Sequence, residues 1–72
     1  MKDLTLSFKD NKETYFSVSF DTIMDFTEAY EEKRYSNPEY QNIEADFFQN
    51  PLLHKTFNSM SDLYNHCQAI LK

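Results

Sequence analysis

The sequence predicts an α+β fold in which an N-terminal antiparallel β-hairpin packs against two or three helices. Two early segments alternate apolar and polar residues, which is the pattern of half-buried strands. Later segments place apolar residues three and four positions apart, which is the pattern of helices. No long linker, low-complexity tract or change of composition interrupts the 72 residues. We therefore expect a single domain over residues 1–72.

The hairpin is expected from two segments, Leu4 to Lys9 and Tyr15 to Phe20. In each segment every second residue is Leu, Phe or Val, and the residues between them are mostly Ser and Thr. The connection Asp10–Glu13 is polar and contains Asn11, a residue type that tolerates left-handed backbone. An antiparallel hairpin with a short turn is the simplest arrangement, with one apolar face and one face rich in Ser and Thr.

A first helix is expected from about Thr22 to Tyr35. Thr22 can cap its N-terminus, and Asp25 follows the cap by three positions, as in a shortened capping box. Acidic residues crowd the first turns, where the helix dipole favours them. The apolar stripe of this helix is formed by Ile23, Phe26 and Tyr30.

A second helix is expected from Pro38 to Asn50. Ser36-Asn37-Pro38-Glu39 is typical of a stop followed by a new start, because proline suits the first position of a helix. Asn50-Pro51 would end this helix, since the residue before a proline avoids helical backbone. Its apolar stripe would be formed by Tyr40, Ile43 and Phe47.

The last helix, over residues 59–71, has the clearest helical spacing in the chain. Its stripe consists of Met60, Leu63, Tyr64, Cys67, Ile70 and Leu71. Its entry repeats an earlier segment, because Phe57 to Leu63 matches Phe20 to Phe26 position for position, with a hydroxyl cap followed by Asp. By this analogy 52–57 is a short third strand or an extended connection, although its periodicity also suits one more helical turn.

The chain contains no glycine. Phosphate-binding loops, dinucleotide-binding turns and nucleophile elbows all depend on glycine, so enzymes of those kinds are excluded. A turn that requires positive φ has to use another residue. The asparagines Asn11, Asn50 and Asn58 are the expected ones.

The charge balance disfavours several partners. Twelve Asp and Glu against seven Lys and Arg give a net charge of -5, which repels nucleic acid and anionic membranes. No apolar run is long enough for a membrane span, and the N-terminus lacks an apolar signal region. With a single cysteine, the sequence favours a reducing, cytoplasmic setting.

No catalytic, metal-binding or cofactor-binding residue is expected. Cys67 lies in the apolar stripe of the last helix, where burial disfavours the thiolate, and His66 points about 100° away around the helix. His54 and His66 do not form the ligand spacing of a zinc site. The chain is therefore not expected to be an enzyme.

The candidate binding region is the acidic middle of the chain, where seven of the twelve acids fall between positions 25 and 46. Tyrosines thread the same region, and tyrosine beside carboxylate suits a protein-binding surface. The candidate protein-binding residues are Asp25, Glu28, Glu31, Glu32, Tyr35, Glu39, Tyr40 and Glu44. The alternative is that these acids only stabilise helix dipoles and keep the protein soluble.

Two functions follow from this composition. The first is a small acidic inhibitor or adaptor, of the kind found among phage and mobile-element accessory proteins, that docks on a basic, nucleic-acid-handling protein through residues 25–46. The second is a self-associating structural or regulatory subunit whose exposed aromatic residues form its oligomer interface. A chain of this size buries a small core, so association of either kind would supplement its stability.

Overall fold

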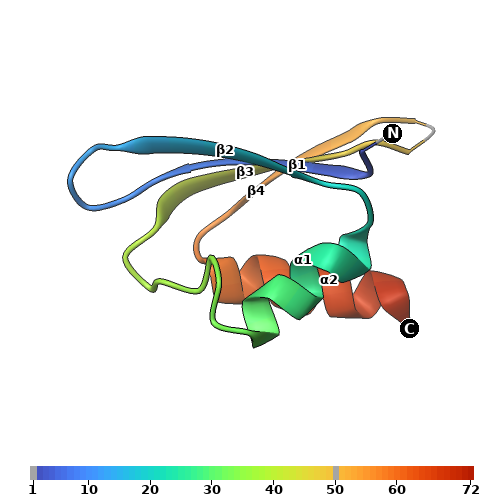
Figure 1. Cartoon of the computed structure of the whole chain (residues 1–72). Helices are drawn as coiled ribbons and strands as arrows, with labels where there is room; N and C mark the ends of the chain where they lie inside the picture. The colour runs from blue at the N-terminus through green and yellow to red at the C-terminus, as the bar shows by residue number, and fades with distance from the viewer. Residues whose placement is uncertain (1, 50) are drawn as a thin grey trace.

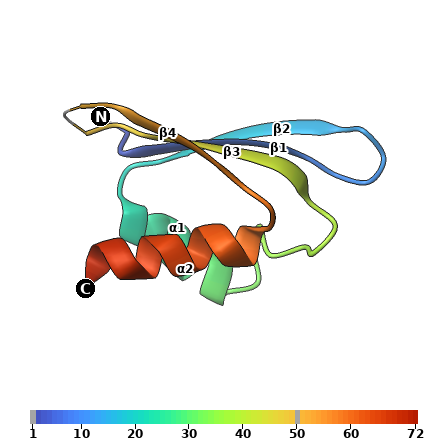
Figure 2. The ribbon, with the colours of Figure 1, turned by 180° about the vertical axis from the view of Figure 1, so that it is seen from behind.

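The computed structural model describes residues 2–49 and 51–72, which form a four-stranded antiparallel sheet with two helices on one face (Figures 1 and 2). The strand order in the sheet is β2-β1-β3-β4. The α+β fold with an N-terminal hairpin is therefore confirmed. In chain order the elements are β1 (Leu4–Lys9), β2 (Tyr15–Phe20), α1 (Ile23–Glu31), β3 (Gln41–Phe47), β4 (Leu53–Phe57) and α2 (Met60–Leu71).

The turn between β1 and β2 is held by the side chain of Asp10. Its Oδ1 atom accepts hydrogen bonds from the backbone N–H groups of Lys12 at 2.8 Å and Thr14 at 3.0 Å. The positive φ of the turn falls on Glu13, at 64°, whose carboxylate pairs with Lys9 at 2.8 Å. The prediction that Asn11 would adopt positive φ in this turn was wrong. The Asp10 side chain holds the turn, and the left-handed residue is Glu13, near its C-terminal end.

The remaining positive-φ residues also differ from the expected ones. They are Lys33, Tyr35 and Asn42. Asn58 is not among them, and Asn50 lies outside the described residues. Among the described asparagines, only Asn42, where β3 bulges, has positive φ.

Helix α1 ends at Glu31, four residues before the expected end at Tyr35. The backbone N–H of Lys33 donates to Tyr30 O at 3.0 Å, and that of Arg34 donates to Ala29 O at 2.9 Å. These two bonds, with Lys33 at φ 69°, form a Schellman motif, which satisfies the last carbonyl groups and turns the chain away. This helix end was not predictable from the sequence, because the position usually holds glycine and here holds lysine.

The expected helix from Pro38 to Asn50 was wrong, because the chain forms strand β3 there. Ile43 and Phe47 are four positions apart, a spacing that places two residues on one side of either a helix or a strand. Ala45 is also buried, while Glu44 is exposed, so the pattern of this segment has a period of two. Pairing with β1 on one side and β4 on the other satisfies its backbone and selects the strand.

The pairing of β1 with β3 contains a bulge at Asn42. Ser7 pairs with Glu44 and Lys9 pairs with Gln41, so two residues of β3 stand opposite Phe8. Asn42 has φ 54°, the left-handed conformation that bulges of this kind require. The bulge lies at the start of β3, and a bulge of this kind bends its strand.

Residues 53–57 form strand β4, which settles the choice between strand and helix for the 52–57 segment. Helix α2 begins after the cap Ser59, so the expected last helix is confirmed. The repeated entry seen in the sequence is confirmed as well, because the backbone N–H of Asp25 bonds to Thr22 and that of Asp62 bonds to Ser59. The described residues contain two helices, the lower of the two numbers expected.

The chain consists of two ββα units with the same layout. In each unit the first strand is central in the sheet, the second is at an edge, and the helix follows. The pair Leu4–Phe20 of the first unit corresponds to the pair Ile43–Phe57 of the second. In the same way, the pair Leu6–Val18 corresponds to the pair Ala45–Lys55. The two units meet where Leu6 pairs with Ala45, which places an approximate two-fold axis at that pair.

The core lies between the sheet and the two helices. Leu4, Leu6, Ile43 and Ala45 are fully buried under the helical layer, and α1 packs along α2 in the opposite direction (Figure 1). In the part of the chain that the structure describes, no helix covers the other face of the sheet (Figure 2). The full set of buried hydrophobic residues is Leu4, Leu6, Phe8, Phe20, Phe26, Ala29, Ile43, Ala45, Phe47, Met60, Leu63 and Cys67.

Candidate functional site

The eight candidate residues do not lie on one surface. Four acids belong to α1 or its end, two tyrosines lie at the edge of the core, and Glu39 lies in the connection to β3. Glu44 projects from β3 on the face of the sheet that the helices leave bare, because it alternates with the buried residues Ile43 and Ala45. The acidic middle of the chain is therefore divided between two faces of the molecule.

Helix α1 carries the largest group of candidate acids, and one of them connects the two helices. Glu31 accepts a hydrogen bond from the hydroxyl of Tyr64 at 2.6 Å and a longer one from the amide of Gln68 at 3.4 Å. The carboxylate raises the pKa of Tyr64 above its ordinary value, since it stabilises the neutral phenol that donates to it. Glu31 thus has a structural role as well as an exposed position.

Two other acids of α1 have partners within the chain. Asp25 completes the capping box, because the backbone N–H of Thr22 donates to its Oδ2 at 3.2 Å. Glu32 forms an ion pair with Arg34 at 2.7 Å, and both side chains are largely exposed. Among the residues described, Glu28 is exposed and makes no side-chain hydrogen bond or ion pair. Glu28 is the α1 carboxylate most available to a partner.

The candidate tyrosines Tyr35 and Tyr40 pack on the chain's own aromatic residues. The ring of Tyr40 lies 4.7 Å from that of Phe8, and the ring of Tyr35 lies 5.6 Å from that of Phe20 in an edge-to-face arrangement. Both are half-buried against the core. Their rings are thus largely used for folding, and the expected outward patch of tyrosines is absent at these two positions.

The bare face of the sheet carries a carboxylate–histidine–carboxylate group. His54 Nδ1 lies 2.6 Å from Asp46 Oδ1, and His54 Nε2 lies 3.4 Å from Glu44 Oε1. The hydrogen bond to Asp46 and the two negative charges raise the pKa of His54, although desolvation acts in the opposite direction. Because Asp46 and His54 are directly paired across β3 and β4, the group joins these strands on the bare face.

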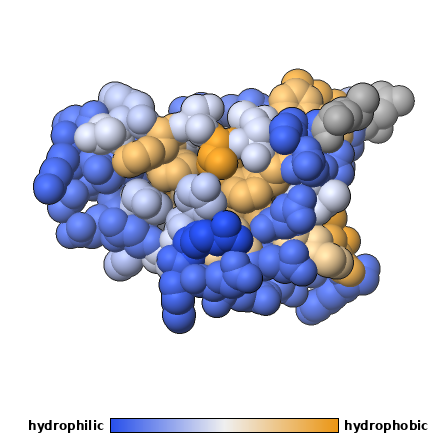
Figure 3. Space-filling view, in the orientation of Figure 1, coloured by the Kyte–Doolittle hydropathy of each residue, from blue (hydrophilic) through white to orange (hydrophobic). Residues whose placement is uncertain are grey.

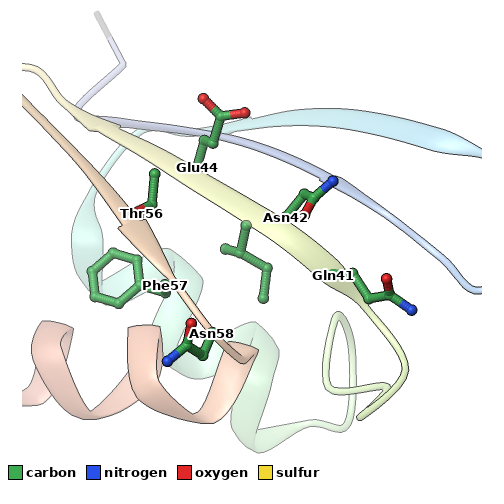
Figure 4. A pocket seen from close by; sticks show the side chains of 7 residues that line it. Gln41, Asn42, Glu44, Thr56, Phe57 and Asn58 are labelled. Atoms are coloured by element: carbon green, nitrogen blue, oxygen red, sulfur yellow. The ribbon is translucent and has the colours of Figure 1, made fainter.

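A shallow hollow of about 430 Å³ lies where β3 and β4 approach the start of α2 (Figure 4). Glu44 and Thr56 point away from the helices, while Phe57 points toward α2 (Figure 4). The lining is mostly amide and hydroxyl groups, which can form hydrogen bonds but provide no nucleophile activated by a base. Its lining residues are Gln41, Asn42, Ile43, Glu44, Thr56, Phe57 and Asn58.

Cys67 is fully buried in α2. Burial raises the pKa of its thiol to about 12, which keeps it protonated near neutral pH. The neighbouring His66 ring packs instead between Phe47 at 5.3 Å and Phe57 at 5.4 Å. No hydrogen bond joins Cys67 to His66 in the structure, as their directions around the helix predict.

The exposed apolar residues form a feature that the sequence analysis did not single out. Tyr15 is 72% exposed and Phe16 is 39% exposed, both on edge strand β2. Leu53, the first residue of β4, and Leu52 before it are also exposed. Figure 3 shows apolar surface between β2 and the helical layer. The alternation of β2 was visible in the sequence, but its position at the edge of the sheet was not.

Among residues 2–49 and 51–72, no helix is both long and apolar enough to cross a membrane, and no cluster of three or more His, Cys, Asp or Glu side chains is arranged to hold a metal ion. No protein-family model, curated protein sequence or solved structure matches this chain.

Proposed function

We propose that this protein is a small acidic protein-binding domain, an inhibitor or adaptor that docks on the basic surface of a nucleic-acid-handling protein through helix α1. One observation carries the proposal: α1 and its C-cap present four exposed carboxylates on the helical layer of the molecule. They are Asp25, Glu28, Glu31 and Glu32.

The spacing of two of these carboxylates is comparable with that of phosphates along a nucleic-acid strand. Glu28 and Glu32 are separated by about 6 Å along the helix axis. This distance is within a factor of two of the axial spacing of phosphates along one DNA strand, about 3.4 Å. A partner whose lysines and arginines bind a nucleic-acid backbone could therefore bind α1 in the same groove, and docking there would exclude the nucleic acid.

The contacts within the chain distinguish acids that are free for a partner from acids that support the fold. Glu28 has no partner among the described side chains, and the Glu32–Arg34 ion pair is exposed and exchanges readily with solvent. Asp25 and Glu31 are held by the helix cap and by Tyr64. Glu28 and Glu32 are therefore proposed as the main contacts.

The test is the double charge reversal of Glu28 and Glu32 to Lys. The wild-type chain is used as bait in extract of its source cell, the captured protein is purified, and its affinity for wild type and variant is measured at low and high salt. We expect the reversal to abolish binding, wild-type binding to weaken with salt, and wild-type chain to displace a DNA oligonucleotide from the partner.

The matched control is the double reversal of Glu39 and Glu44 to Lys, which changes the net charge equally. Glu44 lies on the opposite face of the sheet, so this variant should retain most of the binding. Equal loss in both variants would show that overall charge, and not α1, governs the association. Full binding by the Glu28/Glu32 variant would refute the docking surface.

A further inference from the structure

The two edge strands of the sheet, β2 and β4, are protected to different degrees. An edge strand exposes unpaired backbone groups that can pair with another strand, and proteins block such edges with charged side chains or proline. β4 carries His54 and Lys55 and follows Pro51 closely. β2 has the sequence Tyr-Phe-Ser-Val-Ser-Phe, with no charge and no proline.

Equivalent positions of the two units show the difference directly. Val18 pairs with Leu6 on β2 as Lys55 pairs with Ala45 on β4. The Lys55 ammonium group lies 5.9 Å from the centre of the Phe57 ring, on the helix-facing side of the sheet. β4 thus has an inward-facing charge of the kind that blocks edge pairing, and β2 has a valine in its place.

The free backbone groups of β2 can be assigned from its turn. The backbone N–H of Asp10 donates to Thr14 O at 3.0 Å, directly across the ladder. Hydrogen-bonded pairs recur at every second residue of an antiparallel ladder, so the backbone groups of Phe16, Val18 and Phe20 face β1. The N–H and C=O groups that point outward from the sheet therefore belong to Tyr15, Ser17 and Ser19.

The side chains at this edge are already held in place. Phe16 stacks on Phe8 with ring centres 5.4 Å apart and lies 6.0 Å from Tyr40. It is nevertheless 39% exposed, because neither helix extends over this part of the strand. A strand added beside β2 would cover this ring and continue the sheet without rearranging it.

The β2 segment is complementary to itself. In an antiparallel pair of two β2 strands centred on Val18, Phe16 of each copy meets Phe20 of the other, and Ser17 meets Ser19. No two like charges face each other within the strand. Such a pairing has two-fold symmetry, so a single surface serves both subunits.

Charged residues flank both ends of β2. Lys12, in the turn before β2, makes no ion pair among the described residues. Asp21 follows β2 directly, is exposed and forms an ion pair with Lys2 of its own chain at 2.8 Å. The antiparallel arrangement brings the Lys12 end of one copy toward the Asp21 end of the other, and does so twice.

From this edge we infer that β2 pairs antiparallel with β2 of a second copy, about a two-fold axis at Val18, and joins the two four-stranded sheets into one. The inference rests on the β2 edge and does not depend on the acidic docking function, which uses the carboxylates of α1. It specifies where a self-associating form of this chain would have its interface.

The first test is sedimentation of the full chain over a range of concentrations up to about 0.5 mM, where a weak interface is populated. We expect a reversible dimer for wild type and for Val18→Thr, which keeps a β-branched residue without charge. Val18→Lys copies the charge that β4 carries at the equivalent position and should be monomeric. A wild-type monomer at every concentration, or a dimer that survives Val18→Lys, would overturn the inference.

A cross-link gives a second measurement that does not depend on the folding of Val18→Lys. The two copies of residue 18 form a non-hydrogen-bonded pair, with Cα atoms about 4.5 Å apart, which suits a disulfide. Val18→Cys should form a disulfide-linked dimer on mild oxidation, whereas Lys55→Cys should not. The native Cys67 is fully buried and contributes little background. Absence of the Val18→Cys cross-link, or equal cross-linking by Lys55→Cys, would also overturn the inference.

Discussion

Thr22 and Ser59 cap the two helices in the same way: each side-chain oxygen accepts a hydrogen bond of 3.1 Å from the backbone N–H of the aspartate three residues later. The two caps follow edge strands β2 and β4, so each closes the same kind of strand-to-helix turn in its own ββα unit. The repeat in the sequence therefore corresponds to a repeat in the structure, and its caps can be tested separately.

Replacing either cap with alanine should lower the free energy of unfolding by about 1 kcal/mol, because one N-terminal N–H of the helix loses its acceptor. The helices run in opposite directions, so the caps lie at opposite ends of the helical layer (Figure 1). Thr22→Ala and Ser59→Ala should thus be additive to within about 0.5 kcal/mol in chemical denaturation. A double variant no less stable than one single variant would contradict the independence of the two caps.

Lys33→Gly should stabilise the protein, although it introduces the first glycine of the chain. Lys33 has φ 69° at the Schellman position after α1, where a side chain with a Cβ atom is disfavoured and glycine is not. We expect an increase of about 1 kcal/mol in the free energy of unfolding. Lys12→Gly is the control, since Lys12 is exposed and has no positive φ, and it should not stabilise. Destabilisation by Lys33→Gly would contradict this account of the helix end.

The His54 group should make stability depend on pH. The folded state raises the pKa of His54, so its contribution is fully present below the ordinary value of 6.5 and is lost as the pH rises through the higher folded value. The hydrogen bond to Asp46 is the largest cause, and the more distant Glu44 contributes less.

An NMR titration of the His54 ring should therefore give a pKa above 6.5 in the wild type. Asp46→Asn should lower it strongly, and Glu44→Gln should lower it less. In His54→Gln, the free energy of unfolding should no longer fall as the pH rises from 6.5 through the folded-state pKa of His54. An unchanged His54 pKa in Asp46→Asn would rule out the assigned cause.

Cys67 should react with thiol reagents only when the protein unfolds. Burial raises the pKa of its thiol to about 12, and its side chain is fully buried, so both the thiolate and access to it are missing in the folded state. At pH 8 the rate of reaction with an aromatic disulfide reagent should be slow and should rise with denaturant along the unfolding curve. Ser61→Cys, exposed on the same helix, should react at once.

If the β2 edge pairs two copies, Lys55→Val should open the second edge of the sheet. A chain with two unprotected edges can add copies without closing, and such contacts produce extended assemblies. Light scattering should then detect species larger than a dimer for Lys55→Val, and not for Lys55→Arg. Unchanged size for Lys55→Val would indicate that another feature of β4 protects that edge.

The sequence determined those parts of the fold that local chemistry specifies. The hairpin follows from alternation around a polar turn, and both helix starts follow from hydroxyl caps with an aspartate three residues on. The repeated entry also indicated that 52–57 could be a strand. In each case the deciding contacts lie within a few residues along the chain, so the sequence pattern contains them.

The tertiary structure decided the identity of β3, the end of α1 and the division of the candidate site. Ile43 and Phe47 fit a helix or a strand equally well, and only hydrogen bonding to β1 and β4, whose partners are distant in sequence, selects the strand. Once 41–47 is a strand, Glu44 must alternate to the bare face, away from the acids of α1. Tyr35 and Tyr40 are half-buried against the core by aromatic partners on β1 and β2. These outcomes depend on contacts between segments far apart in the chain, which local periodicity does not contain.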